Sequence, residues 1–282
     1  MISYIIVNFK STKSIHQIIK KISDGSNSIY VVDCSNDYIS ILNESVITPS
    51  NNRNIGFGKA VNLAVSKQKN PTKYLFLINP DVNFKSSDIS KMLSCALEPQ
   101  IGAVCSISNG SHNFIKTSVF RKKIGIFEEI KMSFTSYKKS LVRNKLSRKN
   151  PDSIDIDYLD AGFCLINYES FMRSGGFPEE IFMYGEDLVL SERIRKAGFR
   201  IVLNDEVKVN HPGGGTFGGS TIMKLKRLLY SATGCGKAIS IIRNDKKFIV
   251  YTISFLIILI FRKLFRSKSE IENITLKLDI EE

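Results

Sequence analysis

The sequence predicts an α/β protein in which a mixed, mainly parallel β-sheet is flanked by helices and followed by a helical C-terminal extension. Three observations favour this class. Apolar runs of strand length alternate with segments of helical periodicity over roughly the first hundred residues. Polar residues stand where several of those runs end. A basic region that surrounds a strongly apolar run then extends from Lys224 to Lys268.

The N-terminal half supplies the clearest strand and helix signals. Short apolar runs predict strands, and the isoleucines between Ile15 and Ile22 recur at the spacing of one helix face. In chain order, strands are expected at Tyr4–Val7, Ile29–Val32, Tyr74–Ile78 and Gly102–Ser106, and helices at Ser14–Ile22 and Phe57–Lys69. In mainly parallel sheets of this kind, ligands bind at the carboxyl ends of the strands. The polar residues at those ends are Asn8, Asp33, Asn79 and Asp81.

The C-terminal half begins with a polar, basic and weakly periodic segment at about 109–151, which we interpret as an insertion or loop. Regular elements are expected again beyond it. They are a strand at Tyr158–Ile166, helices at Tyr168–Arg173 and from near Asp187 to Gly198, and short strands at Phe199–Leu203 and Val207–Val209.

Composition narrows the class of protein. The chain has 282 residues, of which 43% are hydrophobic and 24% charged, as in globular domains. No basic segment precedes the first apolar run, so we expect a cytoplasmic strand there rather than a signal peptide. The 5 scattered cysteines predict reduced thiols rather than disulfides or a zinc site. The net charge of +13 predicts an acidic partner, and the absence of nucleic-acid-binding signatures argues against nucleic acid.

The apolar run Phe248–Phe261 has Lys and Arg on both sides. As a helix it would be about 21 Å long, against roughly 30 Å for a bilayer core. Two interpretations remain open, a buried core helix and a helix lying in the membrane interface. We favour the second, because basic flanks suit anionic lipid.

Two motifs offer ligands for a cation. Asn79-Pro80-Asp81 follows a strand, and a carboxylate there can hold a hard divalent cation that bridges a diphosphate. Taken alone, this tripeptide favours an ordinary Pro-Asp turn. His211 also follows a strand and opens a glycine-rich loop, which suits an accessible ligand.

Two further motifs bear on substrate and catalysis. Gly56-Phe57-Gly58 at a helix start, with Asn62 after it, could admit phosphate close to the backbone, although the third glycine of a dinucleotide fingerprint is missing. Glu186 and Asp187 at the start of a helix could supply a general base, or Asp187 could simply cap the helix. The helix dipole would lower the pKa of Asp187, whereas burial beside Glu186 would raise it.

The order of these motifs is more specific than any one of them. It resembles that of the family 2 glycosyltransferases with the GT-A fold, a Rossmann-like architecture, and especially their rhamnosyltransferase-like branch. The matching elements span residues 2 to about 215. They are Ile5-Ile6-Val7-Asn8-Phe9, Val31-Val32-Asp33, Asn54-Ile55-Gly56-Phe57-Gly58 with Asn62, Leu77-Ile78-Asn79-Pro80-Asp81, Gly175-Gly176-Phe177, Phe182-Met183-Tyr184-Gly185-Glu186-Asp187 with Arg193 and Gly198, and His211.

The resemblance implies a role for each matching residue. Asp33 would contact the nucleobase, with Asn8 in the same pocket. Asp81 and His211 would bind Mg²⁺ or Mn²⁺, with Asn79-Pro80 in place of the first half of the usual D-x-D. Asp187 would be the catalytic base, supported by Glu186. The remaining residues of the donor site would be Gly56, Phe57, Gly58, Asn62 and Asn79.

Two positions depart from the family pattern. The family often has a second aspartate two residues after the base, where this chain has Val189. The asparagine that follows Val-Val-Asp in the family is Cys34 here. The first departure weakens the case for acceptor contacts from this helix, and the second leaves the choice of donor less defined.

The resemblance also implies a division of the chain and a function. Residues 1–220 would form the GT-A domain, with a nucleotide-sugar half at about 1–106, the basic insertion at 109–151 and a catalytic half at 152–220. Residues 221–282 would associate with the cytoplasmic face of the membrane. The domain would transfer a sugar, by analogy rhamnose from a deoxythymidine diphosphate donor, with inversion, to a saccharide or lipid-linked saccharide of a cell-surface polysaccharide.

Two other functions remain open at this point. A non-catalytic membrane-associated protein that binds a nucleotide or glycan could have kept the fold, and Val189 is the best support for it. A nucleotidyltransferase would share the first strand and helix. It would normally carry a glycine-rich loop where this chain has Asn8-Phe9-Lys10-Ser11.

Overall fold

The computed structural model describes residues 1–23, 27–50, 52–109, 153–211 and 221–265, and side chains only as far as Ile257 in the last range. The expected basic insertion lies outside these ranges apart from Asn109. The glycine loop after His211 and the chain beyond Phe265 also lie outside them.

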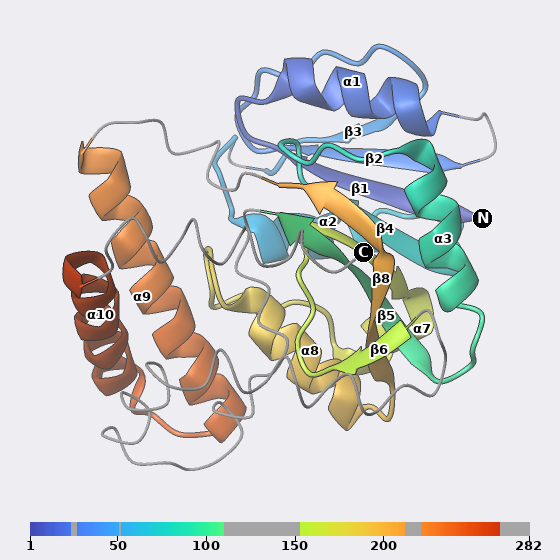
Figure 1. Ribbon diagram of the computed structural model, residues 1–282. Helices are drawn as coiled ribbons and strands as arrows, with labels where there is room; N and C mark the ends of the chain where they lie inside the picture. The colour runs from blue at the N-terminus through green and yellow to red at the C-terminus, as the bar shows by residue number, and fades with distance from the viewer. Residues whose placement is uncertain (24–26, 51, 110–152, 212–220, 266–282) are drawn as a thin grey trace.

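The described strands form one mixed sheet in the order β3-β2-β1-β4-β7-β5-β8-β6 (Figure 1). Parallel pairing joins β1 to β2 and β4, β2 to β3, and β5 to β8, whereas β7 runs antiparallel between β4 and β5, and β6 runs antiparallel to β8. The strands are β1 (Ile2–Asn8), β2 (Ser28–Asp33), β3 (Ser45–Ile47), β4 (Tyr74–Ile78), β5 (Ile101–Asn109), β6 (Ser153–Ile156), β7 (Phe163–Asn167) and β8 (Arg200–Asn210). The expected α/β class with a mixed, mainly parallel sheet is confirmed.

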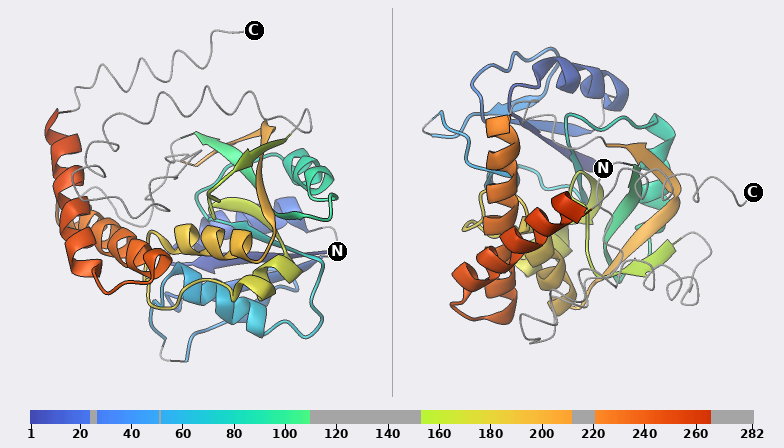
Figure 2. Two further views of the ribbon diagram at one scale, coloured as in Figure 1. Left: turned by 90° about the horizontal axis from the view of Figure 1, so that it is seen from below. Right: turned by 60° about the vertical axis from the view of Figure 1, so that its left-hand side comes forward.

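Helices cover both faces of the sheet and bury a separate apolar cluster on each (Figures 1 and 2). One cluster joins β1, β4 and β8 to α1 (Thr12–Ile22) and α3 (Ser86–Cys95). The other joins the opposite side of the sheet to α2 (Phe57–Ser66), α7 (Tyr168–Ser174) and α8 (Glu186–Lys196). Each fully buried aliphatic or aromatic side chain contributes about 1.5–3 kcal/mol by leaving water. The two clusters therefore fix the sheet that carries the site.

The elements of the C-terminal half differ from expectation in two places. The expected strand Tyr158–Ile166 is a strand only from Phe163 onward, because Tyr158 and Leu159 form hydrogen bonds with α8 instead of with a neighbouring strand. The two short strands expected between Phe199 and Val209 are one strand, β8. Its pairing with β5 shifts register between Ser106 and Ile107, so β8 carries extra residues that interrupt the apolar pattern.

Two helices follow the sheet and lie side by side as a hairpin (Figures 1 and 2). α9 spans Thr221–Arg243 and α10 spans Phe248–Phe265, so the expected apolar helix and the helical extension are confirmed. The turn between them is held by Asp245, which accepts hydrogen bonds from the Lys247 backbone N–H at 3.0 Å and from the Tyr251 hydroxyl at 2.7 Å. Among the described residues, no helix has both the length and the apolarity needed to cross a bilayer.

Candidate active site

The two expected cation ligands meet at the carboxyl-terminal edge of the sheet. Asp81 follows β4 and His211 follows β8, and Asp81 Oδ1 lies 3.1 Å from His211 Nε2. Asn79 Nδ2 lies 3.4 Å from the same ring nitrogen. Burial lowers the pKa of His211, but the hydrogen bond to Asp81 and the charges of Asp81 and Asp160 outweigh it, and the pKa is raised. The negative charge around the ring marks a place suited to a cation.

A backbone bridge explains why residues so far apart in the chain meet. The Asn83 N–H donates to the Asn210 carbonyl at 2.8 Å, and the Asn210 N–H donates back to the Asn83 carbonyl at 3.0 Å. Asn83 stands two residues after Asp81, and Asn210 directly precedes His211. The bridge therefore holds the segment after β4 against the end of β8.

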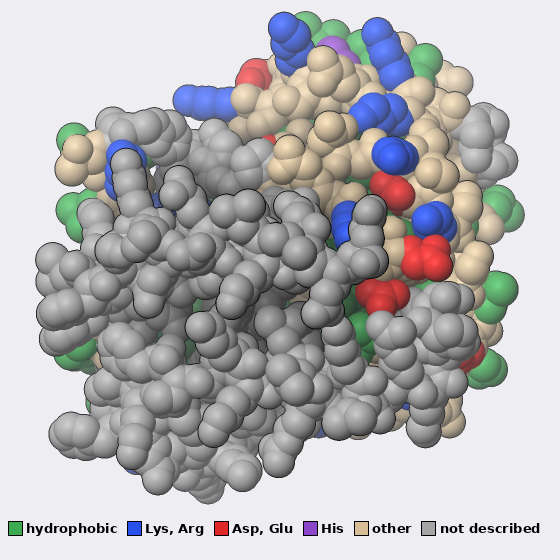
Figure 3. All heavy atoms as spheres, in the orientation of Figure 1, with side chains coloured by type: hydrophobic (Ala, Val, Ile, Leu, Met, Phe, Trp, Pro, Cys, Tyr) green, Lys and Arg blue, Asp and Glu red, His purple; other side chains and the backbone are tan. Residues whose placement is uncertain are grey.

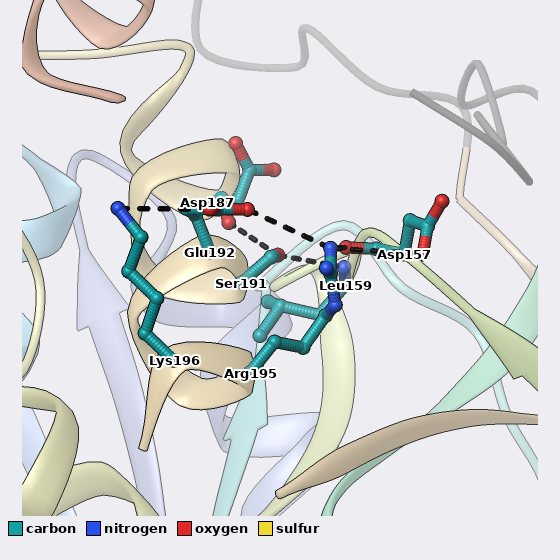
Figure 4. Close-up of polar contacts among 7 residues, drawn as sticks. All are labelled: Asp157, Leu159, Asp187, Ser191, Glu192, Arg195 and Lys196. Atoms are coloured by element: carbon teal, nitrogen blue, oxygen red, sulfur yellow. Dashed lines mark hydrogen bonds and ion pairs between the residues drawn. The ribbon is translucent and has the colours of Figure 1, made fainter. Parts of the chain in front are cut away.

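The base candidate is held by the segment that precedes β7 (Figure 4). Tyr158 donates its hydroxyl hydrogen to Asp187 Oδ2 at 2.6 Å. The Leu159 N–H donates to Ser191 Oγ at 2.9 Å, and Ser191 in turn donates to the Asp187 carbonyl at 2.5 Å. Two turns further along α8, Arg195 pairs with Asp157 at 3.6 Å. Successive residues 157–159 thus lie along one face of α8 and fix the position of Asp187.

The sequence left open whether the helix dipole or burial sets the pKa of Asp187, and in the structure burial prevails. It is the largest influence on Asp187, and with the charge of Asp160 it raises the pKa of this carboxyl despite the hydrogen bond from Tyr158. Burial and then the charge of Asp187 also raise the pKa of Glu186. Glu186 Oε2 is buried without a hydrogen-bond partner among the described residues, which suits a protonated carboxyl. A carboxyl whose pKa lies nearer neutrality is better suited to general base catalysis.

The interpretation of Asp187 as a helix cap is wrong. The N-cap of α8 is Gly185, and Asp187 lies inside the first turn with its side chain directed to Tyr158 and to the Leu188 N–H. Tyr184 and Gly185 both have positive φ, at 65° and 93°. This conformation is uncommon for a tyrosine, and strained backbone of this kind gathers at functional sites.

The turn before α8 also depends on close contact with α9. A Cβ on Gly185 would lie 2.9 Å from the Gly234 carbonyl oxygen, and one on Gly234 would lie 2.0 Å from the Tyr184 carbonyl oxygen. Glycine at both positions lets the two backbones touch. α9, which lies outside the matching motifs, therefore helps to shape the loop that carries Glu186 and Asp187.

Asp160 is a site residue that the sequence analysis missed. Its Oδ1 accepts from the Gly162 N–H at 2.9 Å, and its charge raises the pKa of both His211 and Asp187. A Cβ on Gly162 would lie 2.6 Å from His211 Cε1, so the histidine ring packs on this turn. The charge of Asp160 therefore acts on both a cation ligand and the base candidate. The expected continuous strand at 158–166 concealed it, although the Asp-x-Gly pattern was a turn signal.

The residues expected to meet the nucleobase lie together at the ends of β1 and β2. Asn8 Nδ2 donates to Asp33 Oδ1 at 2.9 Å. Asp33 is 4% exposed, and its oxygens also accept backbone N–H groups from Ser35, Asn36 and Tyr38. Burial raises the pKa of Asp33, but these hydrogen bonds outweigh it and the pKa is lowered. Asp33 is therefore an ionised carboxylate that shapes the loop after β2, and its nucleobase contact remains a prediction.

The expected donor residues at the start of α2 have partners within the protein. A Cβ on Gly56 would lie 2.1 Å from the Phe182 carbonyl oxygen, and one on Gly58 would lie 2.9 Å from Phe177 Cβ. Asn62 clamps Phe177, accepting from its N–H at 3.0 Å and donating to its carbonyl oxygen at 2.9 Å. Phe57 packs edge-on against the same Phe177 ring. These residues join the nucleotide half to the loops before α8, and their donor contacts remain a prediction.

The departure at Val189 has a packing reason. Val189 is 1% exposed and belongs to a cluster with Ile181, Leu188 and Ala238 of α9. An aspartate there would be buried against that helix at a substantial desolvation cost. The position is therefore used for packing α9.

Within the part of the chain that the structure describes, no group of three or more His, Cys, Asp or Glu side chains could hold a metal ion. Mg²⁺ beside phosphates is commonly held by only one or two protein carboxylates, with water and substrate phosphates completing its ligand shell. The described cysteines are free thiols.

No family model matches the chain. In sequence it is similar to rhamnosyltransferase WbbL of Escherichia coli strain K12, with 24% identity over 155 residues, covering 52% of this chain and 56% of the relative. It is also similar to N-acetylglucosaminyl-diphospho-decaprenol L-rhamnosyltransferase of Mycobacterium tuberculosis, with 24% identity over 178 residues and 56% coverage of both chains. The chain thus spans little more than half the length of these curated relatives.

Two solved structures show a similar architecture. One is GalNAc-T7 with UDP, GalNAc and Mn²⁺, with a TM-score of 0.54 and 14% identity, covering 89% of this chain and 55% of that one. The other is S. aureus TarS 1-349 in complex with UDP-GlcNAc, with a TM-score of 0.52 and 14% identity, covering 94% of this chain and 73% of that one. These findings confirm the resemblance inferred from the motifs: the chain has the GT-A fold of these solved glycosyltransferases, and its sequence is similar to those of rhamnosyltransferases.

Proposed function

We propose that the chain is an inverting, metal-dependent glycosyltransferase that moves a sugar from a nucleoside-diphosphate donor to an acceptor hydroxyl. The observation that carries this proposal is that one structure holds both a pair of cation ligands and a carboxyl suited to act as a base. Asp81 and His211 place cation ligands 3.1 Å apart. Asp187, a carboxyl with a raised pKa, is held nearby through Tyr158, and its charge environment includes the same Asp160 that acts on His211.

Asp187 would accept the proton of the acceptor hydroxyl as its oxygen attacks the anomeric carbon and the bond to the leaving nucleoside diphosphate breaks. The Tyr158 hydroxyl donates to Asp187 Oδ2 and the Leu188 N–H donates to Oδ1, so both carboxylate oxygens are held in place while each keeps a lone pair that can accept a proton. One base without a covalent intermediate gives inversion at the anomeric carbon. Together these features predict a single displacement, in which the general base accelerates sugar transfer by about 10²–10⁴-fold.

The ligand set fits Mg²⁺ or Mn²⁺. Carboxylate oxygen and imidazole nitrogen are ligands that Mn²⁺ accepts, and Mg²⁺ prefers oxygen. Two donor atoms about 3 Å apart have the separation expected for neighbouring ligands with bonds near 2.1 Å. When bound, the cation would neutralise the charge of the leaving diphosphate. The GalNAc-T7 structure with Mn²⁺ supports the choice of a divalent metal.

The relatives support particular substrates. One is named a rhamnosyltransferase, and the other is named for transfer of L-rhamnose to N-acetylglucosaminyl-diphospho-decaprenol. We therefore favour rhamnose as the sugar, and as acceptor a saccharide linked to lipid through a diphosphate, in the synthesis of a cell-surface polysaccharide. Asn8, Asp33, Gly56, Phe57, Gly58, Asn62 and Asn79 would bound the donor site.

We place the enzyme at the cytoplasmic face of the membrane, docked through its C-terminal hairpin. Ile249 and Ile253 of α10 are more than half exposed, at 59% and 53%, and Lys246 and Lys247 precede the helix. In the view of Figure 3, the Lys and Arg side chains drawn lie mainly in the upper part, around α1, with Asp and Glu side chains beside them. Deleting the chain after Asp245 should abolish binding to anionic liposomes while a thermal melt still shows a folded domain. Unchanged liposome binding would contradict the placement.

The non-catalytic alternative loses its main support, because Val189 is explained by packing against α9. The decisive experiment is a screen of nucleotide sugars for thermal stabilisation with and without Mn²⁺, followed by a transfer assay with those that bind. A ligand at a hundred times its Kd should add about 2.7 kcal/mol to the free energy of unfolding. Donor binding without any release of nucleoside diphosphate would favour the binding protein instead.

A further inference from the structure

A cavity of about 350 Å³ lies between the helical hairpin and the loop before α8, and the proposed transfer makes no use of it. Its lining is predominantly apolar. α9 contributes Tyr230, Gly234 and Lys237, α10 contributes Phe248, Ile249 and Ile253, and the loop contributes Phe182 and Met183. Ligand pockets in proteins start at about this size.

The cavity adjoins the loop that leads into the base candidate. Gly234 lines the cavity and touches the backbone of Tyr184. The next residue, Cys235, does not line the cavity. Burial first, and then the charges of Asp187 and Glu186, raise the pKa of its thiol. Met183, on the cavity wall, precedes Asp187 by four residues. The loop and the helix that form the cavity wall are therefore the same two elements that hold the turn before Asp187.

The mouth of the cavity combines apolar and basic groups. Phe248, Ile249 and Ile253 are each more than 40% exposed, so the apolar lining continues onto the surface of α10. Lys237 lines the cavity, and its ammonium donates to a neutral group, the Glu180 carbonyl oxygen at 3.0 Å. Its positive charge is thus available to an anion at the mouth. Lys246 and Lys247 precede the lining residue Phe248.

We propose that this cavity binds the first isoprenoid units of a polyprenyl diphosphate that carries the acceptor saccharide. The proposal rests on the proposed function and deepens it. Such a molecule joins a sugar to a hydrocarbon chain through a diphosphate, and neighbouring elements offer a partner for each part: Asp187 for the sugar, Lys237 for the diphosphate and the apolar cavity for the chain. A concave site of this volume suits one flexible chain, whereas docking on a bilayer needs only an exposed face.

Binding to the full-length chain, measured by calorimetry with two soluble probes, tests this occupant directly. Farnesyl diphosphate carries an isoprenoid chain, and methyl diphosphate carries the same anion without it. We expect farnesyl diphosphate to bind at least about tenfold more tightly, which requires the burial of only a few CH₂ groups. Ile253→Asp and Ile249→Asp place a carboxylate at the mouth and should remove that advantage. Ile222→Asp is the matched control, because Ile222 is 69% exposed on α9 and does not line the cavity.

The outcomes separate this proposal from the proposed function. Equal affinity for the two probes, or equal loss in the Ile222→Asp control, would overturn the prenyl site even if sugar transfer is observed. Loss of liposome binding in the Ile253→Asp variant with farnesyl affinity unchanged would also overturn it and assign the surface to the bilayer. A farnesyl preference that Ile253→Asp removes would support the site even in a protein that transfers no sugar. Nucleotide-sugar binding, measured on the same variants, should not change.

Discussion

The Tyr158 hydroxyl donates a hydrogen bond of 2.6 Å to Asp187 Oδ2. Burial, with the charge of Asp187 next, raises the pKa of Tyr158 well above its ordinary value, so the phenol stays protonated and remains a donor. A hydrogen bond to the ionised form of a carboxyl lowers its pKa. Tyr158 thus partly offsets the burial that raises the pKa of Asp187.

The substitution Tyr158→Phe should therefore raise the pKa of Asp187 further. The acid limb of the pH–rate profile for sugar transfer should move to higher pH, on the order of one unit. Tyr74→Phe is the control, because it removes another buried hydroxyl, bonded to the Ala96 carbonyl oxygen, far along the chain from α8. A profile that keeps its acid limb in the Tyr158 variant would show that the tyrosine does not tune the base.

The raised pKa of Glu186 predicts how stability depends on pH. An unfolded glutamate titrates near pH 4.3, whereas the folded one holds its proton to higher pH. Between these two values the folded state binds the extra proton, so stability falls as pH rises through this window and then stays low. Glu186→Gln keeps the shape without the charge and should stabilise the protein by roughly 1–3 kcal/mol above neutral pH.

Denaturant unfolding of wild type and the Glu186→Gln variant at pH 5 and pH 8 measures this effect. The gain should be large at the higher pH and small at the lower one. An equal gain in stability at pH 5 and at pH 8 would mean that Glu186 has the same pKa in the folded and in the unfolded protein.

The cation site predicts a loss of metal-dependent donor binding. Asp81→Asn and His211→Ala each remove one of the two ligands proposed among the described residues, so each should abolish the Mn²⁺-dependent part of nucleotide-sugar affinity. Asn83 and Asn210 should still bridge the strands, so the melting temperature should change little. Titration of donor with Mn²⁺ and with EDTA checks this, and full Mn²⁺ dependence in both variants would rule the pair out.

A substitution of Asn62 tests whether this residue stabilises the fold, contacts the donor, or does both. Asn62→Ala removes both hydrogen bonds to the Phe177 backbone and should cost about 1–3 kcal/mol of stability. Chemical denaturation measures that cost, and donor titration of the folded variant measures the other role. A variant of normal stability whose donor affinity is lost would assign Asn62 to the donor site alone.

Much of the fold could be predicted because its strands are buried on both faces. The segment Tyr74–Ile78 is wholly buried and was expected with its bounds unchanged. β3 could not be found, because it is a three-residue strand on the edge of the sheet with little buried surface. The sequence pattern predicted two strands where the structure has β8, because the register shift in β8 breaks the alternation of buried residues.

Site residues could be predicted where they follow strands that are visible as apolar runs in the sequence. Asp81 and His211 stand directly after strands that the apolar pattern reveals, and the structure brings them together. Asp160 and Tyr158 could not be assigned, because the fold creates their roles: the charge of Asp160 acts on His211 and Asp187, and Tyr158 donates a hydrogen bond to α8. The contact of Gly234 in α9 with Tyr184 could not be predicted either, because no local sequence pattern indicates that two backbones touch.

The central claim is that Asp187 is the base of a divalent-dependent sugar transfer. Asp187→Asn is nearly isosteric and leaves the helix N-cap, Gly185, untouched. The most direct test is the initial rate of sugar transfer with Mn²⁺ by wild type and by this variant at saturating donor. We predict that the wild type transfers sugar and that the variant is slower by about 10²–10⁴ while it binds the donor equally well. A variant that transfers sugar within a few fold of the wild-type rate would contradict the account.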